Sequence, residues 1–315
     1  MIEKIAGKRK ISQKTRREYI FAYSLLAIAI VQFCIFYIGV NFNSILLAFR
    51  KAVKLEGGGI GYVFTLDNFK RLFSDFRNPD SSVAIGIVNT LKYWGLNMFI
   101  MMPISLFISY FLYKKVLFYK GFRVILFLPS IISGVVFVSM FKIMLEPFGP
   151  VYTMLDKMFG YEMPFLLTDE RTATPTIMFY CFWTGLAGNM ILYQGAMNRL
   201  PQEVIEAGEL DGISWFRELV QIIIPMIWST VSITIILQVS GIFTAGGPIL
   251  LFSSQGQAMG GANTMTLPYF IFLQTWLYGS YEYPAAIGIF FTICSLPLVF
   301  GIRFVMSKLD PEVEY

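Results

Sequence analysis

The chain has 315 residues, of which 56% are apolar, 17% aromatic and only 14% charged, with a net charge of +5. A soluble domain carries about 25% charged residues, so the composition argues against a soluble all-α protein and favours a polytopic helical membrane protein. Histidine is absent and the three cysteines lie far apart in apolar runs, which argues against a disulfide framework, a zinc site and histidine-based acid–base chemistry.

Six apolar stretches approach the ~20 residues that cross a ~30 Å hydrocarbon core. The sequence therefore predicts an all-α fold with six transmembrane helices at about Tyr19–Val40, Val83–Leu112, Phe122–Leu145, Thr174–Met197, Leu219 into the 240s, and Tyr283–Met306. We expect residues 19–308 to form one transmembrane domain, preceded by a basic cytoplasmic leader at 1–18 and followed by a cytoplasmic tail at 309–315. No small-residue cleavage site follows the leader, so we expect no cleavable signal peptide.

The distribution of Lys and Arg sets the expected orientation of these spans. Basic residues are dense in the leader and between Lys114 and Arg123, and sparser in the segments on the other side of the membrane. Both termini and the segment between the fourth and fifth spans are therefore predicted to be cytoplasmic. Because the basic residues lie mostly beside spans, the positive charge does not indicate nucleic-acid binding.

The segments predicted to face outward are Leu47–Ser81, Glu146–Ala173 and Gly246–Glu282. The glycine cluster Gly57–Gly61 is interpreted as a flexible turn and not a phosphate cradle, because no Gly-Lys-Ser/Thr follows it. Met265–Leu277 is too short to span and is interrupted by proline, so we expect it to lie at the membrane interface.

A polar, acid-rich segment separates the fourth and fifth spans, and we call residues 199–225 the acidic loop. Pro201 suits the first turn of a helix, and the carboxylates that follow favour its N-terminal end. Asp211-Gly212 should end this helix with Gly212 in the left-handed conformation, Ser214 can cap the next helix, and Pro225 should kink the fifth span. The result is a surface helix of about 16 Å.

Within this helix, Ala207 and Gly208 would let a partner approach closely, and the carboxylates beside them can bind arginines. An ordinary amphipathic loop helix is the alternative interpretation.

The order and spacing of these residues resemble a known family. Glu206-Ala207-Gly208, Asp211-Gly212, Ile222 and Pro225 are similar to the E-A-A loop of binding-protein-dependent ABC importer permeases. The departures are mild, with Gly208 for Ala, Leu219 for Phe and Ile224 for Leu. The resemblance covers about 89–306, and it implies the type I ABC importer permease fold in the carbohydrate-uptake, maltose-type branch.

The resemblance implies that the acidic loop couples transport to ATP hydrolysis on a partner. Glu206 would pair with a basic residue of a cytoplasmic ATPase subunit, Ala207 and Gly208 would allow close approach, and Gly212 would make the turn; Asp211 and Pro225 complete the motif. The chain has no G-x-x-x-x-G-K-[ST], so it cannot bind ATP in the Walker manner.

We therefore expect no catalytic residue, metal or cofactor in this chain, with ATP and Mg bound by two partner ATPase subunits. The other expected partners are a second related permease, an extracellular substrate-binding protein, a sugar and membrane lipid, and no nucleic acid. The expected location is the bacterial cell membrane, as a multi-pass protein.

The fourth span is unusually polar, with Trp183, Thr184 and Asn189 among its residues. Aromatic, hydroxyl and amide groups suit a sugar path, although helix packing with interhelical hydrogen bonds is the alternative. The resemblance implies that the solute touches residues of the third, fourth and fifth spans: Ser130, Cys181, Thr184, Gly185, Gly188, Gln238, Gly241 and Ile242.

Two features leave alternatives open. Thr244–Pro248 resembles the family's T-N-G-G-P outer loop, yet only nineteen residues separate Pro225 from Thr244; either the fifth span is brief or this motif breaks it. Lys92 lies about nine residues into the second span, where it could face the path, pair with a carboxylate or mark a misplaced span start.

The predicted function is the transmembrane subunit of an ATP-driven importer that moves a sugar inward by alternating access, with an oligosaccharide as the leading candidate. A permease of the same family for a polyol, glycerophosphodiester or amino acid is the nearer alternative. An ion-coupled secondary transporter or a membrane enzyme would need intramembrane carboxylates or catalytic histidines, and no carboxylate falls in the middle of a predicted span.

Overall fold

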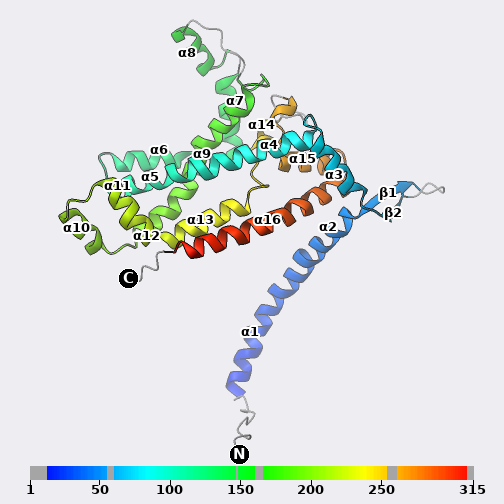
Figure 1. Ribbon diagram of the computed structural model, residues 1–315, viewed down its shortest axis with the longest axis horizontal. Helices are drawn as coiled ribbons and strands as arrows, with labels where there is room; N and C mark the ends of the chain where they lie inside the picture. Colours follow the sequence, from blue (N-terminus) through cyan, green and yellow to red (C-terminus); the bar gives the residue numbers. More distant parts are fainter. Residues whose placement is uncertain (1–12, 55–59, 147, 160–165, 254–260, 311–315) are drawn as a thin grey trace, which may run out of the picture.

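The computed structural model of the protein describes residues 13–54, 60–146, 148–159, 166–253 and 261–310. The predicted leader and tail therefore lie mostly outside the described residues. Within these ranges the regular structure is helical apart from one β-hairpin. Long helices lie side by side in a bundle, and the N-terminal helix projects away from it (Figure 1).

The N-terminal helix consists of α1 (Gln13–Gln32), the π-helix η1 (Phe33–Gly39) and α2 (Val40–Ala48). Its apolar part, Tyr19–Ala48, is long and apolar enough to cross a bilayer, and it extends beyond the first predicted span at the C-terminal end. None of its most apolar window is buried within the protein, because α2 packs on α16 while α1 points away (Figure 1). Such a surface requires lipid or a protein neighbour.

The segment predicted as the first outer loop is more structured than expected. β1 (Arg50–Lys54) pairs antiparallel with β2 (Ile60–Phe64), so the all-α prediction misses one small sheet. Of the glycine cluster, residues 57–59 lie outside the described ranges and Gly61 belongs to β2. α3 (Asp67–Arg77) follows and buries Leu72 in a cluster with residues of α16.

The second predicted span is confirmed as one continuous 32-residue helix, Ser82–Tyr113. It consists of α4 (Ser82–Gly95), the π-helix η2 (Leu96–Met101) and α5 (Met102–Tyr113). Ser81 fixes its start, because the hydroxyl accepts a hydrogen bond from the Ala84 N–H at 3.1 Å and satisfies a donor that the first turn leaves free.

The third predicted span, Phe122–Leu145, is wrong as a single helix. α6 (Tyr119–Ile131) ends before Ile132 and Ser133, which have ψ of 141° and 129°, and α7 (Gly134–Leu145) then takes a new direction (Figure 1). Pro129 in α6 lacks a backbone N–H, and Ser133 and Gly134 are weak helix formers, so the helix breaks between Pro129 and Gly134. α8 (Pro150–Phe159) follows α7.

The fourth and sixth predicted spans are each found as one helix. α9 (Ala173–Met197) has 25 residues and packs against α5, α6 and α13, which places it at the centre of the bundle. α16 (Glu282–Lys308) has 27 residues and packs against α2, α3 and α13.

The fifth predicted span is broken. Its first half comprises α11 (Trp215–Arg217), the π-helix η3 (Glu218–Ile223) and α12 (Ile224–Met226). Its second half, α13 (Trp228–Ser240), is bent by 80° from the first. The 13 residues of α13 give about 20 Å of helix, which is less than a ~30 Å hydrocarbon core.

Six long apolar helices are therefore not found. In the part of the chain that the structure describes, four helices are long and apolar enough to cross a bilayer, or five if the bent pair forms one span. α9 is long but too polar to count among them, and one of the four is Gly134–Met158, which begins in the second half of the third predicted span.

Short helices connect α13 to α16: α14 (Ile249–Phe252), the 3₁₀-helix η4 (Gly261–Thr264), α15 (Leu267–Phe272) and the π-helix η5 (Leu273–Leu277). The location of Met265–Leu277 at the membrane interface stays a prediction, but its first half packs inside the protein and not on its surface. Leu267, Tyr269 and Phe270 are buried, and α15 packs against α4, because the fold supplies an apolar neighbour that the sequence could not show.

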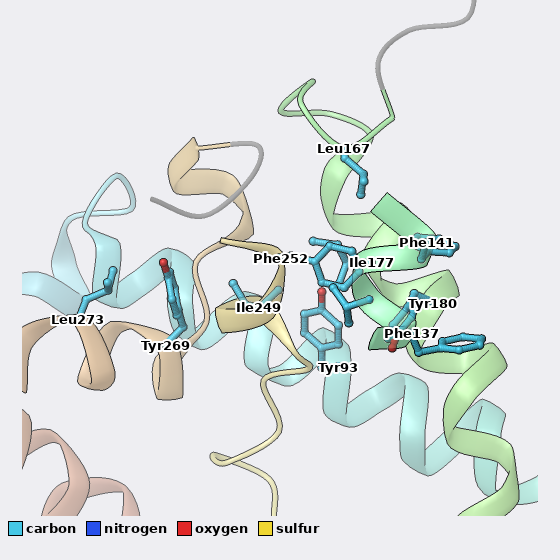
Figure 2. Packing of buried hydrophobic residues seen from close by; sticks show 11 residues of the cluster. Tyr93, Phe137, Phe141, Leu167, Ile177, Tyr180, Ile249, Phe252, Tyr269 and Leu273 are labelled. Carbon is cyan, nitrogen blue, oxygen red and sulfur yellow. The ribbon is translucent and has the colours of Figure 1, made fainter. Parts of the chain in front are cut away.

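An aromatic core joins these short helices to the long ones. Figure 2 shows Phe252 of α14 beside Tyr180 of α9, with Phe137 and Phe141 of α7 on the same side and Tyr93 of α4 below. The Tyr180 ring centroid lies 5.3 Å from that of Phe252 and 5.1 Å from that of Phe141, separations at which aromatic pairs add to area burial. This core fixes the end of α4 and the first half of α9 relative to each other.

Candidate functional site

α10 (Gln202–Leu210) is the surface helix predicted for the acidic loop. Its exposed face holds residues at helical spacing: Glu203, Glu206, Ala207 and Leu210. Ile205 and Gly208 lie on the opposite, buried face, as the 3.6-residue period requires. Leu210 is 89% exposed, and the sequence analysis missed it; its one signal is an apolar residue directly before Asp211-Gly212.

Gly208 does not face outward as predicted. A Cβ at this position would come within 3.0 Å of Ile222 Cδ1 and 3.4 Å of Ile213 Cγ2. The missing side chain therefore lets α10 pack closely on η3 of its own chain, and of the two small residues only Ala207 is available to a partner.

The end of α10 confirms the predicted glycine turn. Gly212 has φ +72°, a conformation that glycine adopts without steric cost. The Ile213 N–H donates to Gly208 O at 3.1 Å and the Gly212 N–H donates to Glu209 O at 3.1 Å, which together satisfy the last carbonyls of the helix. Ser214 occupies the position before α11, but its side chain makes no capping hydrogen bond, so that part of the prediction is wrong.

Three charged side chains tie the acidic loop to the C-terminal end of α5. Lys114 Nζ lies 2.7 Å from Glu209 Oε1 and 2.6 Å from Glu218 Oε1. Only 4% of the Glu218 side chain is exposed, and its Oε2 accepts a hydrogen bond of 3.4 Å from the Tyr110 hydroxyl. A buried carboxylate without a cation is costly, so Lys114 holds the start of η3 and the end of α10 together.

The charge on Lys114 persists at neutral pH. Its partial burial lowers the pKa, but the contacts with Glu209 and Glu218 outweigh burial and hold the pKa above its ordinary value. The sequence analysis missed this cluster. The signal available was Glu218 itself, a carboxylate directly before the apolar run 219–224.

Pro225 lies in α12, just before the sharp bend of the fifth span. Ile227 leaves the helical conformation, with φ −100° and ψ 16°, and the two halves meet at 80°. A proline removes one backbone hydrogen bond and crowds the preceding turn, and the π-helix η3 before it accommodates that crowding. The predicted kink is confirmed and is sharper than a simple proline kink.

The predicted path residues of α9 fall on different sides of the helix. Cys181, Thr184 and Gly188 are spaced by three and four residues and share one face. Gly188 has no neighbour within 4 Å of a Cβ position, and the Thr184 hydroxyl donates to the Tyr180 carbonyl at 2.9 Å. Gly185 packs against Met101, whose Cε would lie 2.2 Å from a Cβ at this position.

Trp183 and Asn189 do not join that face. The Trp183 ring centroid lies 5.2 Å from that of Phe137, and Trp183 lines an apolar cavity of about 600 Å³ between α7, α8 and the first half of α9. Asn189 is partly buried on α9. Neither Trp183 nor Asn189 lies on the face of α9 that holds Thr184.

The remaining path residues lie on the neighbours of α9. Ser130 is exposed on α6, where its hydroxyl donates to the Phe127 carbonyl at 2.7 Å. The Gln238 carbonyl accepts a hydrogen bond of 2.8 Å from Trp94 Nε1. Gly241 and Ile242 follow the end of α13. Since α6 and α13 both pack on α9, these elements flank its polar segment.

Thr244–Pro248 follows α13, which is brief, and packs against neighbouring elements, although Thr244 and Gly247 are exposed. Gly247 has φ +58°, and a Cβ there would lie 3.0 Å from Tyr93 Cε1 and 3.2 Å from Cys181 Sγ. Gly246 packs as closely against Pro268. The structure therefore bears out the brief helix, since α13 ends at Ser240 and the motif is irregular backbone that follows it beside α4, α9 and α15.

Within the described ranges, no three carboxylate, thiol or histidine side chains come together in a way that could hold a metal ion. The candidate site consists of the exposed face of α10 and a set of helix faces around α9.

Residues 83–315 match the model of the family described as "Binding-protein-dependent transport system inner membrane component". Two curated proteins of Bacillus subtilis (strain 168) are similar to the chain. The polygalacturonan/rhamnogalacturonan transport system permease protein YteP is 24% identical over 258 residues, covering 79% of this chain and 76% of YteP. The arabinooligosaccharides transport system permease protein AraP is 23% identical over 280 residues, covering 87% and 84%.

One solved structure, a bacterial ABC transporter involved in the import of the acidic polysaccharide alginate, contains a chain of the same fold. It matches with a TM-score of 0.77 and 21% identity, and covers 94% of this chain and 97% of that one. At this identity the likeness shows the fold, and it supports the bundle with its broken and short helices.

Proposed function

Because this chain belongs to the family of binding-protein-dependent transport system inner membrane components, we propose that it is the permease subunit of an ATP-driven importer that takes up an oligosaccharide by alternating access. The observation that carries this proposal is α10, whose exposed face presents Glu206, Ala207 and Leu210 while its other face is fixed to the bundle. A rigid helix with one free face suits a partner that must push on the membrane helices.

The ATPase partner would bind this exposed face. Glu206 would pair with a basic side chain, Ala207 would let the partner's backbone come close, and Leu210 would fill an apolar pocket, since exposed apolar residues at the centre of a contact contribute most to binding. ATP and Mg would be bound by two such ATPase subunits, because the chain lacks a phosphate-binding P-loop motif.

The displacement would pass to two membrane elements at once. Lys114 links α10 and η3 to the end of α5, and Gly208 packs α10 on η3 without a gap. The bend at Ile227 separates this unit from α13, so α13 can change its angle while η3 follows α10. Rocking about such a break is the alternating-access motion that we propose.

The proposed topology places both termini and the acidic loop in the cytoplasm of a bacterial cell, with six crossings of its membrane. Tyr19–Ala48, Ser82–Tyr113 and Glu282–Lys308 would supply three of these crossings. The bent pair and α9 would supply one each, and α6–α7, which shares α7 with the long helix Gly134–Met158, would supply the sixth. The exposed apolar surface of α1 would be covered by a second permease subunit and by lipid.

The proposed solute is a sugar oligomer handed over by an extracellular binding protein. Its support is the similarity to permeases whose names specify arabinooligosaccharides and polygalacturonan or rhamnogalacturonan. Cys181, Thr184 and Gly188 on one face of α9, flanked by Ser130, Gln238, Gly241 and Ile242, would line the path.

Reconstitution tests this function directly. The chain is co-expressed with a candidate partner permease, ATPase and binding protein from the same organism, purified through a tag on this chain, and placed in liposomes. We expect the ATPase to copurify and labelled oligosaccharide to accumulate only with ATP and binding protein. Uptake by this chain alone, or labelling of an α10 cysteine variant from outside intact cells, would refute it.

A further inference from the structure

A cavity of about 680 Å³ lies between α4 and the first half of α9. Its walls are one face of α4 from Ala84 to Lys92, the start of α9, the turn Glu170-Arg171 and Asn263 of η4. This volume falls within the ~300–1,000 Å³ of small-molecule sites. None of the residues predicted for the solute path lines it.

A hydrogen-bonded wall holds this cavity in shape. Asn89 Nδ2 and the Thr174 hydroxyl both donate to the Asn263 carbonyl, at 2.7 Å and 3.0 Å. The Asn263 side-chain amide donates to Glu170 Oε2 at 3.1 Å. The network joins α4, α9 and η4, so the polar wall is already ordered before any ligand binds, which lowers the entropic cost of binding.

Two cations on this cavity have no ion-pair partner among the described residues. Lys92 Nζ donates to Asn89 Oδ1 at 3.3 Å, which occupies one of its three donors. Arg171 makes none of the ion pairs found in the described ranges. With Glu170 the lining carries one net positive charge, so it favours an anionic ligand.

Of the three interpretations of Lys92, the structure disfavours two: a misplaced start of the span and pairing with a carboxylate among the described residues. α4 begins at Ser82, which agrees with the predicted span start, and no described carboxylate pairs with Lys92. A lysine more than two turns into an apolar helix is expensive to keep unless it serves a site.

We propose that this cavity binds the carboxylate of an acidic saccharide, with Lys92 and Arg171 as its charged contacts. The Arg171 guanidinium would take the carboxylate through two parallel N–H donors, and Glu170 Oε1 would accept from a ring hydroxyl. Val88 and Met178 would cover the apolar face of the sugar ring. This inference rests on the proposed function and adds the charge class of its substrate.

A pair of probes that differ only in charge tests it. The assembled transporter, in nanodiscs of phosphatidylcholine, is titrated by calorimetry with digalacturonate and with its dimethyl ester. We expect the acid to bind at least about tenfold more tightly than the ester, as a charge-assisted contact gives, and its affinity to fall as salt is raised.

Variants locate the site. Lys92→Met and Arg171→Gln should each weaken binding of the acid about tenfold and leave binding of the ester unchanged. Lys92→Arg keeps the charge and should retain the preference, which separates loss of the contact from loss of folding. Lys157→Met, on α8 and outside this cavity, is the control and should bind both probes as the wild type does.

Equal affinity for acid and ester, or an unchanged preference in both charge-removing variants, would overturn the inference. A lipid headgroup is the other source of an anion. If the acid fails to bind in phosphatidylcholine while phosphatidylglycerol copurifies with the wild type and not with Lys92→Met, the cavity is a lipid site. ATP-driven uptake of a neutral oligosaccharide without binding of the acid would refute this inference alone, whereas absence of any ATP-dependent uptake would refute the proposed function.

Discussion

Gly208 lies so close to Ile222 that a methyl group on Gly208 would come within 3.0 Å of Ile222 Cδ1. The contact joins the buried face of α10 to η3, which lies in the first half of the broken fifth span. Together with the Lys114 ion pairs, it makes the acidic loop and the start of that span one unit.

The loss of stability and coupling caused by substituting Gly208 should increase with the size of the new side chain. Gly208→Ala should be tolerated, since only the mobile end of Ile222 must shift, and the family pattern carries alanine there. Gly208→Leu should push α10 away from η3, lower the apparent melting temperature of the purified complex and leave ATP hydrolysis poorly coupled to uptake. The ratio of uptake to hydrolysis in liposomes measures coupling, and equal ratios for the two variants would contradict this packing role.

Removal of the Lys114 charge should destabilise the loop. Lys114→Met leaves Glu218 as an unpaired carboxylate that is almost fully buried, and we expect a loss of about 1–3 kcal/mol; this is less than for a fully buried pair because Lys114 is partly exposed to solvent. Adding Glu218→Gln should restore part of the loss, and Lys114→Arg is the conservative control. Thermal unfolding of the wild type, both single variants, the double variant and Lys114→Arg provides the measurement, and additive effects of Lys114→Met and Glu218→Gln would disprove the coupling.

The Lys114 contribution should vary with pH in one direction only. Its pKa is raised in the folded protein, so the stabilisation is complete below the unfolded value of about 10.4 and is lost as the pH rises through the folded pKa. The difference in melting temperature between wild type and Lys114→Met should stay constant from about pH 6 to 9 and shrink above about 10.5. A difference that grows with pH would have the wrong sign.

Gly212 should be sensitive to backbone conformation and not to size. Its φ is +72° and nothing lies within 4 Å of a Cβ, so Gly212→Val costs about 1–2 kcal/mol through strain and should uncouple ATP hydrolysis from uptake. Gly212→Asn should keep most coupling, because asparagine tolerates this conformation. Fully coupled uptake by Gly212→Val would show that the turn is dispensable.

Two glycines of α9 should separate packing from path. Gly185→Val meets Met101 and should lower stability by about 1–3 kcal/mol. Gly188→Val enters open space, so stability should change by less than about 0.5 kcal/mol while uptake falls if Gly188 faces the solute. Melting curves and initial uptake rates of the two variants distinguish a packing role from a path role. Normal uptake by Gly188→Val would show that the face of α9 holding Gly188 does not line the path.

Much of the membrane architecture was readable from local pattern. The length of apolar runs defined the helices that contain Tyr93, Cys181 and Phe291, because the bilayer sets both the length and the composition of a crossing. The turn at Gly212 and the bend near Pro225 were also readable, because glycine and proline act on their own backbone. The order Glu206-Ala207, Asp211-Gly212, Pro225 pointed to the family that the match of residues 83–315 shows.

Only the tertiary structure decided which side of each helix packs against the rest of the protein and which side stays exposed. Gly208 turned inward because Ile222, fourteen residues later in sequence, is its neighbour in space. Lys114 and Glu218 belong to distant segments, so their pairing left no local trace, and Leu267 was buried because α4 passes beside it. Apolar and charged side chains interact with whatever groups lie near them in space. A sequence pattern shows such neighbours only when they lie within one helix turn or one strand repeat of each other.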